Sequence, residues 1–452
     1  MNVLVLNGSP KGAYSITLQT VLYLEKVFPE HTFNILHVGQ RIKALEKDFT
    51  PALDALKDAD LLLFSYPVYT FIAPCQLHRF LELMKEHKVD VSGKYASQIT
   101  TSKHFYDVTA HKYVQDNCQD LGLKFLRGLS ADMEDLTTSK GQAEAVSYWE
   151  QLCWSMEQGL SEPCYNKTAA PNHVPVTIPS NAVSTEDGDV VIIADLKPED
   201  KQLADMIGRF QKVLPVKSRV VNIREYPFRG GCLGCFNCAT DGICIYKDGF
   251  DEFLRNDIQT AQAMIYAFNI SDHSMGAQFK MFDDRQFCNG HRTVTVGMPV
   301  GYLISGNYSE EANLQMILEG RAQVGGNVLV GMATDEFDPN RTIDDMANTL
   351  VYALKHPASR PSNFLGIGGM KIFRDLIYQM QGMMKADHRF YKKHGIYDDF
   401  PQKHKGTILK MYLIGMLLSS PKIKSKMGNA MNEGMIAPYR KVLDEAKPKH
   451  SK

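Results

Sequence analysis

Short apolar runs alternate with longer segments of helical spacing along the first quarter of the chain. The apolar runs lie at residues 2–6, 32–38, 59–65 and 96–100. Segments of helical spacing lie between them, at about residues 15–27 and 50–57. Continuous apolar runs are typical of strands inside a parallel sheet, because helices cover both faces of such a sheet. The pattern therefore predicts an α/β domain with a doubly wound parallel sheet.

The same order of strands recurs in the middle of the chain. Residues 60–83 can be laid over the stretch 202 positions later without a gap, which places Gln76 on Gln278. The second set of predicted strands lies at residues 190–194, 219–223, 263–269 and 300–304. An internal repeat indicates a duplicated structural unit. We therefore predict two tandem sheets, and a chain of 452 residues is long enough for more than one core.

The two copies set the predicted domain boundaries. A segment rich in Pro, Ser, Thr and Asn separates them and has no sustained periodicity, so we expect it to be a linker. The predicted parts are a first domain at 1–159, a linker at 160–187, a second domain at 188–340 and a helical C-terminal extension at 341–452.

The loop after the first predicted strand has the composition of an anion-binding turn. Its small, basic or hydroxyl residues, together with those that begin the next helix, are Gly8, Ser9, Lys11, Gly12, Ser15 and Thr17. Small residues let backbone N–H groups approach an anion, hydroxyls donate to its oxygens, and a helix N-terminus favours negative charge. The loop matches neither the Walker motif nor Gly-x-Gly-x-x-Gly. The alternative is an ordinary Ser-Pro turn that caps the helix.

The corresponding loop of the second copy, residues 195–200, reads Asp-Leu-Lys-Pro-Glu-Asp and lacks the Gly-Ser pair. Its carboxylates would repel a phosphate, so we expect no second phosphate site there. The first copy, in turn, has no cysteine between residues 38 and 59. The two copies are therefore predicted to have specialised.

Aromatic loops follow the third and fourth predicted strands of the first copy, at residues 66–71 and 100–106. Ligands of open α/β sheets bind at the carboxyl ends of the strands. Both loops are therefore expected beside the phosphate-type loop, where they offer two walls for a flat ring. Taken singly, an aromatic residue such as Tyr69 or Phe105 is more often a core residue than a ring contact.

Four of the nine cysteines lie within thirteen residues. They are Cys232, Cys235, Cys238 and Cys244. Such spacing lets one loop offer four thiolates to a single iron–sulfur cluster, and neighbouring glycines such as Gly234 allow the turns that this requires. Two alternatives stay open, a zinc site and a redox-active thiol loop without a metal.

The net charge and the cysteine content indicate which partners and which cellular compartment to expect. The net charge is −1 and the pI is about 6.9, which gives no overall electrostatic reason to expect nucleic acid as a partner. The first apolar run follows Met1 without a basic leader, so we expect no signal peptide. An odd number of cysteines with one dense cluster fits the reducing cytoplasm better than a disulfide framework.

The motifs resemble the flavodoxin-like NADPH-dependent FMN reductase and iron–sulfur flavoprotein families. The resemblance implies that FMN phosphate contacts come from Ser9, Lys11, Ser15 and Thr17. It implies ring contacts from Pro67, Val68, Tyr69 and Thr70 and, more loosely, from Thr101, Ser102 and Phe105. The four cysteines, with Asp248 after them, resemble the segment that holds a 4Fe–4S cluster in iron–sulfur flavoproteins.

By this resemblance the chain is expected to be an FMN-dependent oxidoreductase. Electrons would pass from NAD(P)H or ferredoxin to FMN and the cluster, and then to a small organic molecule or a redox protein. Tyr69 or His104 could donate a proton to an organic acceptor. The alternative function is a redox sensor or electron carrier, without enzymatic activity, in which the cysteine loop acts as a switch.

The two copies are expected to pack as an internal pseudo-dimer, with the Cys232 loop against the flavin edge of the first domain. A homodimer is a further option. From residue 361 onward, 17 Lys and Arg stand against 7 Asp and Glu, and the apolar run 407–418 is followed by Lys422, Lys424 and Lys426. This run is too short to span a bilayer. The extension is interpreted as a helical lid or dimer arm, a peripheral membrane contact, or a docking surface for an acidic redox partner.

Overall fold

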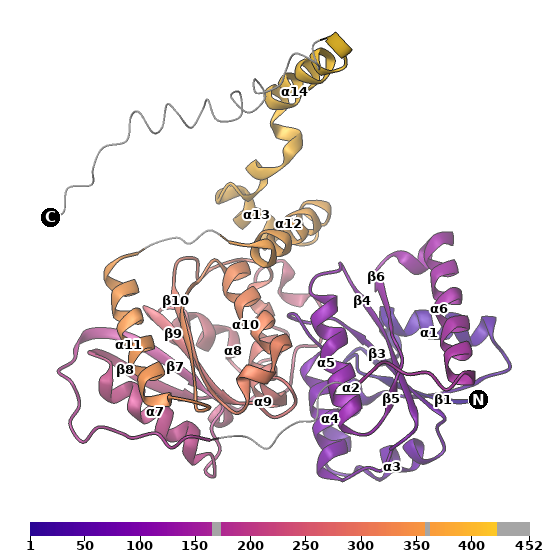
Figure 1. Cartoon of the computed structure of the whole chain (residues 1–452), viewed down its shortest axis with the longest axis horizontal. Helices are drawn as coiled ribbons and strands as arrows, with labels where there is room; N and C mark the ends of the chain where they lie inside the picture. The colour runs from indigo at the N-terminus through magenta and orange to yellow at the C-terminus, as the bar shows by residue number, and fades with distance from the viewer. Residues whose placement is uncertain (165–172, 358–361, 423–452) are drawn as a thin grey trace. The chain divides into compact units, whose positions relative to one another are not determined.

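The computed structural model of the protein describes residues 1–164, 173–357 and 362–422. The chain divides into two compact units, Met1–Phe390 and Tyr391–Lys452. The first unit contains two β-sheets, each flanked by helices (Figure 1). The prediction of two tandem α/β sheets is therefore confirmed.

The first sheet has the strand order β2-β1-β3-β4-β5, and β6 also pairs with β4. All of its strand pairs are parallel. Its strands are β1 (Asn2–Asn7), β2 (Thr32–Leu36), β3 (Leu61–Pro67), β4 (Tyr95–Ser102), β5 (Lys124–Phe125) and β6 (Leu129–Asp132). Its helices are α1 (Ile16–Val27), α2 (Val38–Leu45), α3 (Thr50–Lys57), α4 (Cys75–Glu86), α5 (Asp107–Asp120) and α6 (Ser139–Glu157).

The second sheet has the order β11-β10-β9-β7-β8, again with parallel pairs throughout. Its strands are β7 (Glu186–Ala194), β8 (Val216–Asn222), β9 (Ala263–Asn269), β10 (Pro299–Ser305) and β11 (Val328–Thr334). Its helices are α7 (Lys201–Val213), α8 (Phe250–Phe253), α9 (Gly276–Arg285), α10 (Ala312–Gly325) and α11 (Pro339–Lys355). Read in the opposite direction, this order is β8-β7-β9-β10-β11, which matches β2-β1-β3-β4-β5 of the first sheet strand for strand. The two sheets therefore have the same strand order, as a tandem duplication requires.

The continuous apolar runs become the central strands because both faces of each sheet are covered. The first six residues of β3, from Leu61 to Tyr66, are all buried, and so are the last five of β7, from Val190 to Ala194. Alternation between a buried and an exposed face is seen instead at the edge strand β2. Burial of apolar surface on this scale is the main driving force for the fold.

Helices α4 and α9, which correspond in the two copies, pack against each other within the first unit. Phe80 of α4 and Phe282 of α9 belong to one apolar cluster that extends through both copies. A buried polar group reinforces the contact, since the Asp272 carboxylate accepts from Tyr113 at 2.7 Å and pairs with His78 at 2.6 Å. The two sheets thus share a core, and residues of both can line one site.

The predicted boundary at residue 340 falls inside α11, which packs against β11 and α7 of the second sheet. Helix α12 (Phe364–Gln379) follows, packs against α10, and belongs to the first compact unit. Helix α13 (Lys385–Lys393) crosses the border between the two units. Part of the predicted linker, residues 165–172, lies outside the described residues.

The second compact unit contains α14 (Lys405–Leu418), which forms where the sequence has its apolar run. Several of its large apolar side chains are at least half exposed, among them Leu409, Tyr412 and Met416. Among the described residues, no helix is long and apolar enough to cross a membrane. Lys424 and Lys426 lie outside the described residues. Peripheral membrane contact and partner docking through this unit stay predictions.

Candidate functional site

The loop between β1 and α1 is held by its own polar groups. The Ser9 N–H donates to Asn7 Oδ1 at 3.2 Å, and Asn7 Nδ2 donates to the carbonyl of Gly12 at 2.9 Å. Gly12 has φ +56°, a backbone conformation that is strained for other residues, and a Cβ at this position would also require the Gln40 amide to move. The loop is therefore a tight, fixed turn at the start of a helix.

Hydroxyl groups follow this turn. Ser15 caps α1 by accepting a hydrogen bond from the N–H of Leu18 at 3.4 Å. The hydroxyl of Thr17, on α1, lies 2.6 Å from that of Thr101, near the end of β4, and so connects the start of the helix to a strand end. Ser9, Ser15 and Thr17 are all buried. Hydroxyls, a lysine and a helix N-terminus meet here, as an anion site requires.

The loop after β3 turns sharply beside this site. Tyr69 and Ile72 pair with each other through both backbone hydrogen bonds, at 2.8 and 3.2 Å. Thr70 and Phe71 between them have φ of 42° and 77°, which residues other than glycine seldom adopt. Such strain persists only where the surroundings hold it, and it is often found at binding sites.

The second domain supplies part of that support. Lys280 of α9 is buried, and its ammonium donates to the Tyr69 carbonyl at 3.0 Å. Burial lowers the pKa of Lys280, but the neighbouring carboxylates of Asp284 and Asp283 outweigh burial and raise it. The lysine therefore stays charged, and the conformation of the Tyr69 loop depends on a helix more than 200 residues away.

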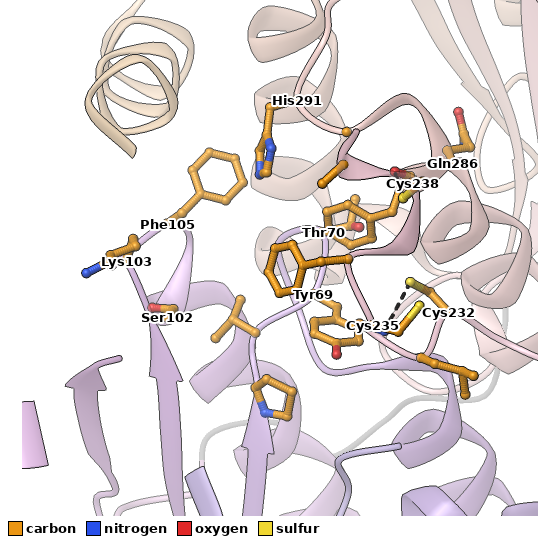
Figure 2. Close-up of a pocket in the computed structure, with 18 of the residues that line it drawn as sticks. Tyr69, Thr70, Ser102, Lys103, Phe105, Cys232, Cys235, Cys238, Gln286 and His291 are labelled. Carbon is orange, nitrogen blue, oxygen red and sulfur yellow. Dashed lines mark hydrogen bonds between the residues drawn. The ribbon is translucent and has the colours of Figure 1, made fainter. Parts of the chain in front are cut away.

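A cavity of about 350 Å³ opens at this edge of the first sheet. All the residues predicted to hold FMN line it, and so do Cys232, Cys235, Cys238 and Cys244. Figure 2 shows Tyr69, Ser102 and Phe105 from the first domain around the same space as Cys232 and Cys235 from the second. The structure thus brings together two motifs that are separated by more than 200 positions.

Direct packing joins the cysteine loop to the other walls. Gly234 has φ +59°, and a Cβ on it would come within 1.8 Å of Tyr69 Oη. The Lys11 ammonium lies 5.4 Å from the centre of the Phe236 ring. The close approach of the two domains therefore depends on a glycine in the cysteine segment.

The cysteine loop is anchored from behind by an ion pair. Arg285 at the end of α9 binds both carboxylate oxygens of Asp248, at 2.7 and 2.8 Å, and also donates to the Gly230 carbonyl at 2.9 Å. Bidentate pairs of this kind are strong and directional. Asp248, noted in the sequence because it follows the cysteines, thus fixes both ends of their loop.

The donor set of this loop suits an iron–sulfur cluster, since four thiols of one short segment line one cavity. Burial raises the pKa of the Cys232 thiol, and that of Cys238 to about 11, so both are neutral thiols when no metal is bound. The Cys232 sulfur accepts from the N–H of Gly234 at 3.4 Å. Within the described ranges, no three His, Cys, Asp or Glu side chains are grouped closely enough to hold a metal ion.

Two further cysteines lie near the loop and were not singled out from the sequence. A Cβ on Gly231 would come within 2.1 Å of Cys75 Sγ, which belongs to α4 of the first domain. Burial raises the pKa of Cys75 and of Cys288, the latter to about 12. Neither residue has a sequence motif around it, so only the tertiary contact identifies them.

The two predicted proton donors differ in their placement. Tyr69 lines the cavity, and burial raises the pKa of its hydroxyl well above the ordinary value. His104 is not among the residues that line it, and its Nδ1 lies 2.8 Å from Asp107 Oδ2 with half of the side chain exposed. The structure therefore does not bring His104 to the site.

A second cavity of about 730 Å³ lies at the corresponding edge of the second sheet. Asp195 lines it and is ion-paired with Arg224 at 2.5 Å, while burial raises the pKa of Asp195 to about 6. The lining also includes Arg79, Glu82 and Lys197. The second cavity therefore lies at the position in the second copy that the first cavity has in the first copy. The loop that begins with Asp195 stands there in place of the hydroxyl-rich loop around Ser9.

Comparison with known proteins finds a family model that matches the N-terminal part of the chain and a relative that shares part of its sequence. Residues 1–115 match the family described as NADPH-dependent FMN reductase. An iron–sulfur flavoprotein from Archaeoglobus fulgidus is 25% identical over 175 residues, which cover 36% of this chain and 78% of that protein. These findings confirm the predicted resemblance and the prediction of a flavin-dependent oxidoreductase of the NAD(P)H-dependent reductase type.

Solved structures with some likeness include two reductases. An NAD(P)H:quinone oxidoreductase from Methanothermobacter marburgensis is 12% identical, with a TM-score of 0.29, and the alignment covers 37% of this chain and 99% of that one. An FMN-dependent NADH-azoreductase from Bacillus anthracis is 13% identical, with a TM-score of 0.27, over 33% and 98%. Likeness at this level says nothing about the ligands of this chain.

Proposed function

We propose that the chain, whose first 115 residues match the NADPH-dependent FMN reductases, binds one FMN in the cavity of the first domain and passes electrons through it. One observation carries the proposal. The phosphate-type loop, the Tyr69 loop and the cysteine loop line a single cavity, and Gly234 packs against Tyr69. A flavin held there would touch both domains.

The residues divide the task of binding FMN between them. Ser9, Ser15 and Thr17 would donate to the phosphate, with Lys11 supplying positive charge and α1 its N-terminal dipole. The strained Tyr69 loop, held by Lys280, would lie along one side of the ring system and Phe105 along another. These rigid walls would orient the ring and keep water from its reacting face.

Bound FMN supplies the exchange of electron pairs and single electrons, because a flavin can accept a hydride and release its electrons one at a time. The protein contributes position and electrostatics. Tyr69, whose hydroxyl keeps its proton because burial raises its pKa, can donate a hydrogen bond within the cavity but does not supply negative charge there. NAD(P)H is proposed as the donor, with ferredoxin as the alternative.

We further propose that Cys232, Cys235, Cys238 and Cys244 hold a 4Fe–4S cluster. Support comes from the donor set, from the anchoring of the loop by Arg285 and Asp248, and from the relative in Archaeoglobus fulgidus that is called an iron–sulfur flavoprotein. In the structure the sulfurs are not grouped as a finished metal site. Binding of a cluster would therefore draw the loop together, which its glycines permit.

The test is an anaerobic titration of the FMN-loaded full chain with NADPH. We expect the flavin absorption to bleach within seconds, and repeated turnover to occur when an electron acceptor such as ferricyanide is added. A flavin that stays oxidised with NADPH and NADH but is reduced by reduced ferredoxin would identify the other donor. Failure with all three donors would contradict the proposed activity and favour a redox sensor or carrier.

A further inference from the structure

Helix α14 of the second compact unit carries a stripe of apolar side chains. Within its 14 residues, large apolar residues recur as adjacent pairs every four positions. This spacing places them on one side of an α-helix, over about half of its circumference. The opposite side is mixed, because Thr407 and Lys410 lie there beside Met411 and Ile414. The members of the apolar stripe are Ile408, Leu409, Tyr412, Leu413, Met416 and Leu417.

The apolar stripe is open to solvent along its whole length. The exposed fraction of its side chains runs from 40% at Ile408 to 71% at Tyr412, and Leu413 in the middle is 50% exposed. Apolar surface gains free energy when it leaves water. A contiguous exposed apolar patch therefore marks an interaction surface.

The charge around the apolar stripe has one sign. Residues 404–432 include five lysines and no Asp or Glu. Lys405 and Lys410 belong to the helix itself, and both are exposed. Electrostatic complementarity then requires a negatively charged partner. The surface that receives the stripe is therefore both apolar and anionic.

An anionic lipid surface fits these features better than a protein surface does. A bilayer needs no matching groove, because an apolar helix face enters its interface while lysine side chains extend to the headgroups. Tyr412 suits such a position, since tyrosine is enriched where hydrocarbon meets water. A second copy of the chain would bring its own lysines opposite those of the first, and like charges repel.

The length of α14 determines how it can lie on a bilayer. A helix of 14 residues measures about 21 Å, which is less than the roughly 30 Å of a hydrocarbon core. The helix therefore lies in the plane of the interface. In this orientation the apolar stripe faces the lipid chains, and Lys410 on the opposite side faces the headgroups and water.

We infer that α14 binds the surface of an anionic lipid membrane through the apolar stripe and its flanking lysines. No described residue of α14 lines the flavin cavity, so the inference does not rest on the proposed function. The partner is defined by two properties, an apolar interior that takes up the stripe and negative headgroups that attract the lysines.

The test is flotation of the full chain with lipid vesicles of two compositions. One is phosphatidylcholine alone, and the other has one phosphatidylglycerol for every three phosphatidylcholines. We expect the wild type to bind the mixed vesicles at least about tenfold more tightly, because each lysine near an anionic surface adds attraction. In about 1 M NaCl, where the Debye length is about 3 Å, this difference should disappear.

Leu413→Glu removes an apolar side chain from the middle of the stripe and adds a negative charge. We expect binding to the mixed vesicles to weaken about a hundredfold, since both apolar burial and electrostatic attraction are lost. Thr407→Glu is the matched control, because it adds the same charge at an exposed position on the opposite side of the helix. We expect it to weaken binding by about fivefold at most.

Leu413→Ser, which adds no charge, is the second variant if Leu413→Glu fails to fold, and we expect binding about tenfold weaker than that of the wild type. Equal binding by Leu413→Glu and Thr407→Glu would overturn the inference, and so would equal binding of the wild type to both kinds of vesicle. A wild type that binds neither would also overturn it. If sedimentation then shows a dimer that Leu413→Glu dissociates, the stripe belongs to a contact between two copies.

Discussion

Replacement of Ser9 by aspartate is expected to weaken FMN binding by about three orders of magnitude. Ser9 is buried in the turn that would hold the phosphate. Two like charges about 4 Å apart repel by about 4 kcal/mol at the effective dielectric of a protein surface. That energy corresponds to a change in Kd of roughly 10³-fold. Calorimetric titration of the metal-free chain with FMN measures the effect.

Ser147→Asp is the matched control, because Ser147 is exposed on α6 and adds the same charge away from the cavity. The control should bind FMN as the wild type does, and circular dichroism should show both variants folded. A folded Ser9→Asp variant with wild-type affinity would mean that the phosphate lies elsewhere. Such a result would also show that a carboxylate in this kind of loop does not prevent FMN binding. The carboxylates of the second-domain loop, which begins with Asp195, would then no longer be evidence against FMN binding at that edge.

Cys235→Ser is expected to remove the iron and acid-labile sulfide from anaerobically reconstituted protein while leaving one FMN per chain. A serine hydroxyl is a poor substitute for a thiolate ligand, so a cluster that needs four cysteines does not assemble stably. Cys235 is exposed in its loop, so we expect the conservative replacement to leave the fold intact. Elemental analysis and flavin quantification on the same sample measure both quantities.

Cys153→Ser is the control, since Cys153 lies on α6 of the first domain, outside the cysteine loop. It should retain full iron content. Zinc in place of iron in the wild type would support the alternative metal site, and absence of any metal would support a redox-active thiol loop. Full iron content in Cys235→Ser would contradict the proposed ligand set.

The sequence predicted the sheets and the phosphate side of the site because both have local signals. Continuous apolar runs mark buried parallel strands, and the turn around Ser9 carries its hydroxyls and glycines within a few residues. Because the carboxyl ends of parallel strands lie at one edge of a sheet, the Tyr69 and Phe105 loops could be predicted to lie beside the Ser9 turn. The cavity lined by all these residues follows from that arrangement.

The remaining parts of the site depend on contacts between distant segments. Lys280 reaches the Tyr69 carbonyl across 211 positions, and Phe373 reaches Phe105 from a helix outside both repeats. No local pattern marks either residue. His104 shows the reverse case, because its loop was predicted correctly but its left-handed backbone and its pairing with Asp107 take the side chain elsewhere.

The most direct test of a shared flavin and cysteine site is an absorption spectrum of the full chain after anaerobic reconstitution with FMN, iron and sulfide. The account predicts flavin bands and a broad iron–sulfur shoulder, with one FMN and four irons per chain after removal of excess reagents. A chain that stays colourless and takes up no FMN would contradict the account.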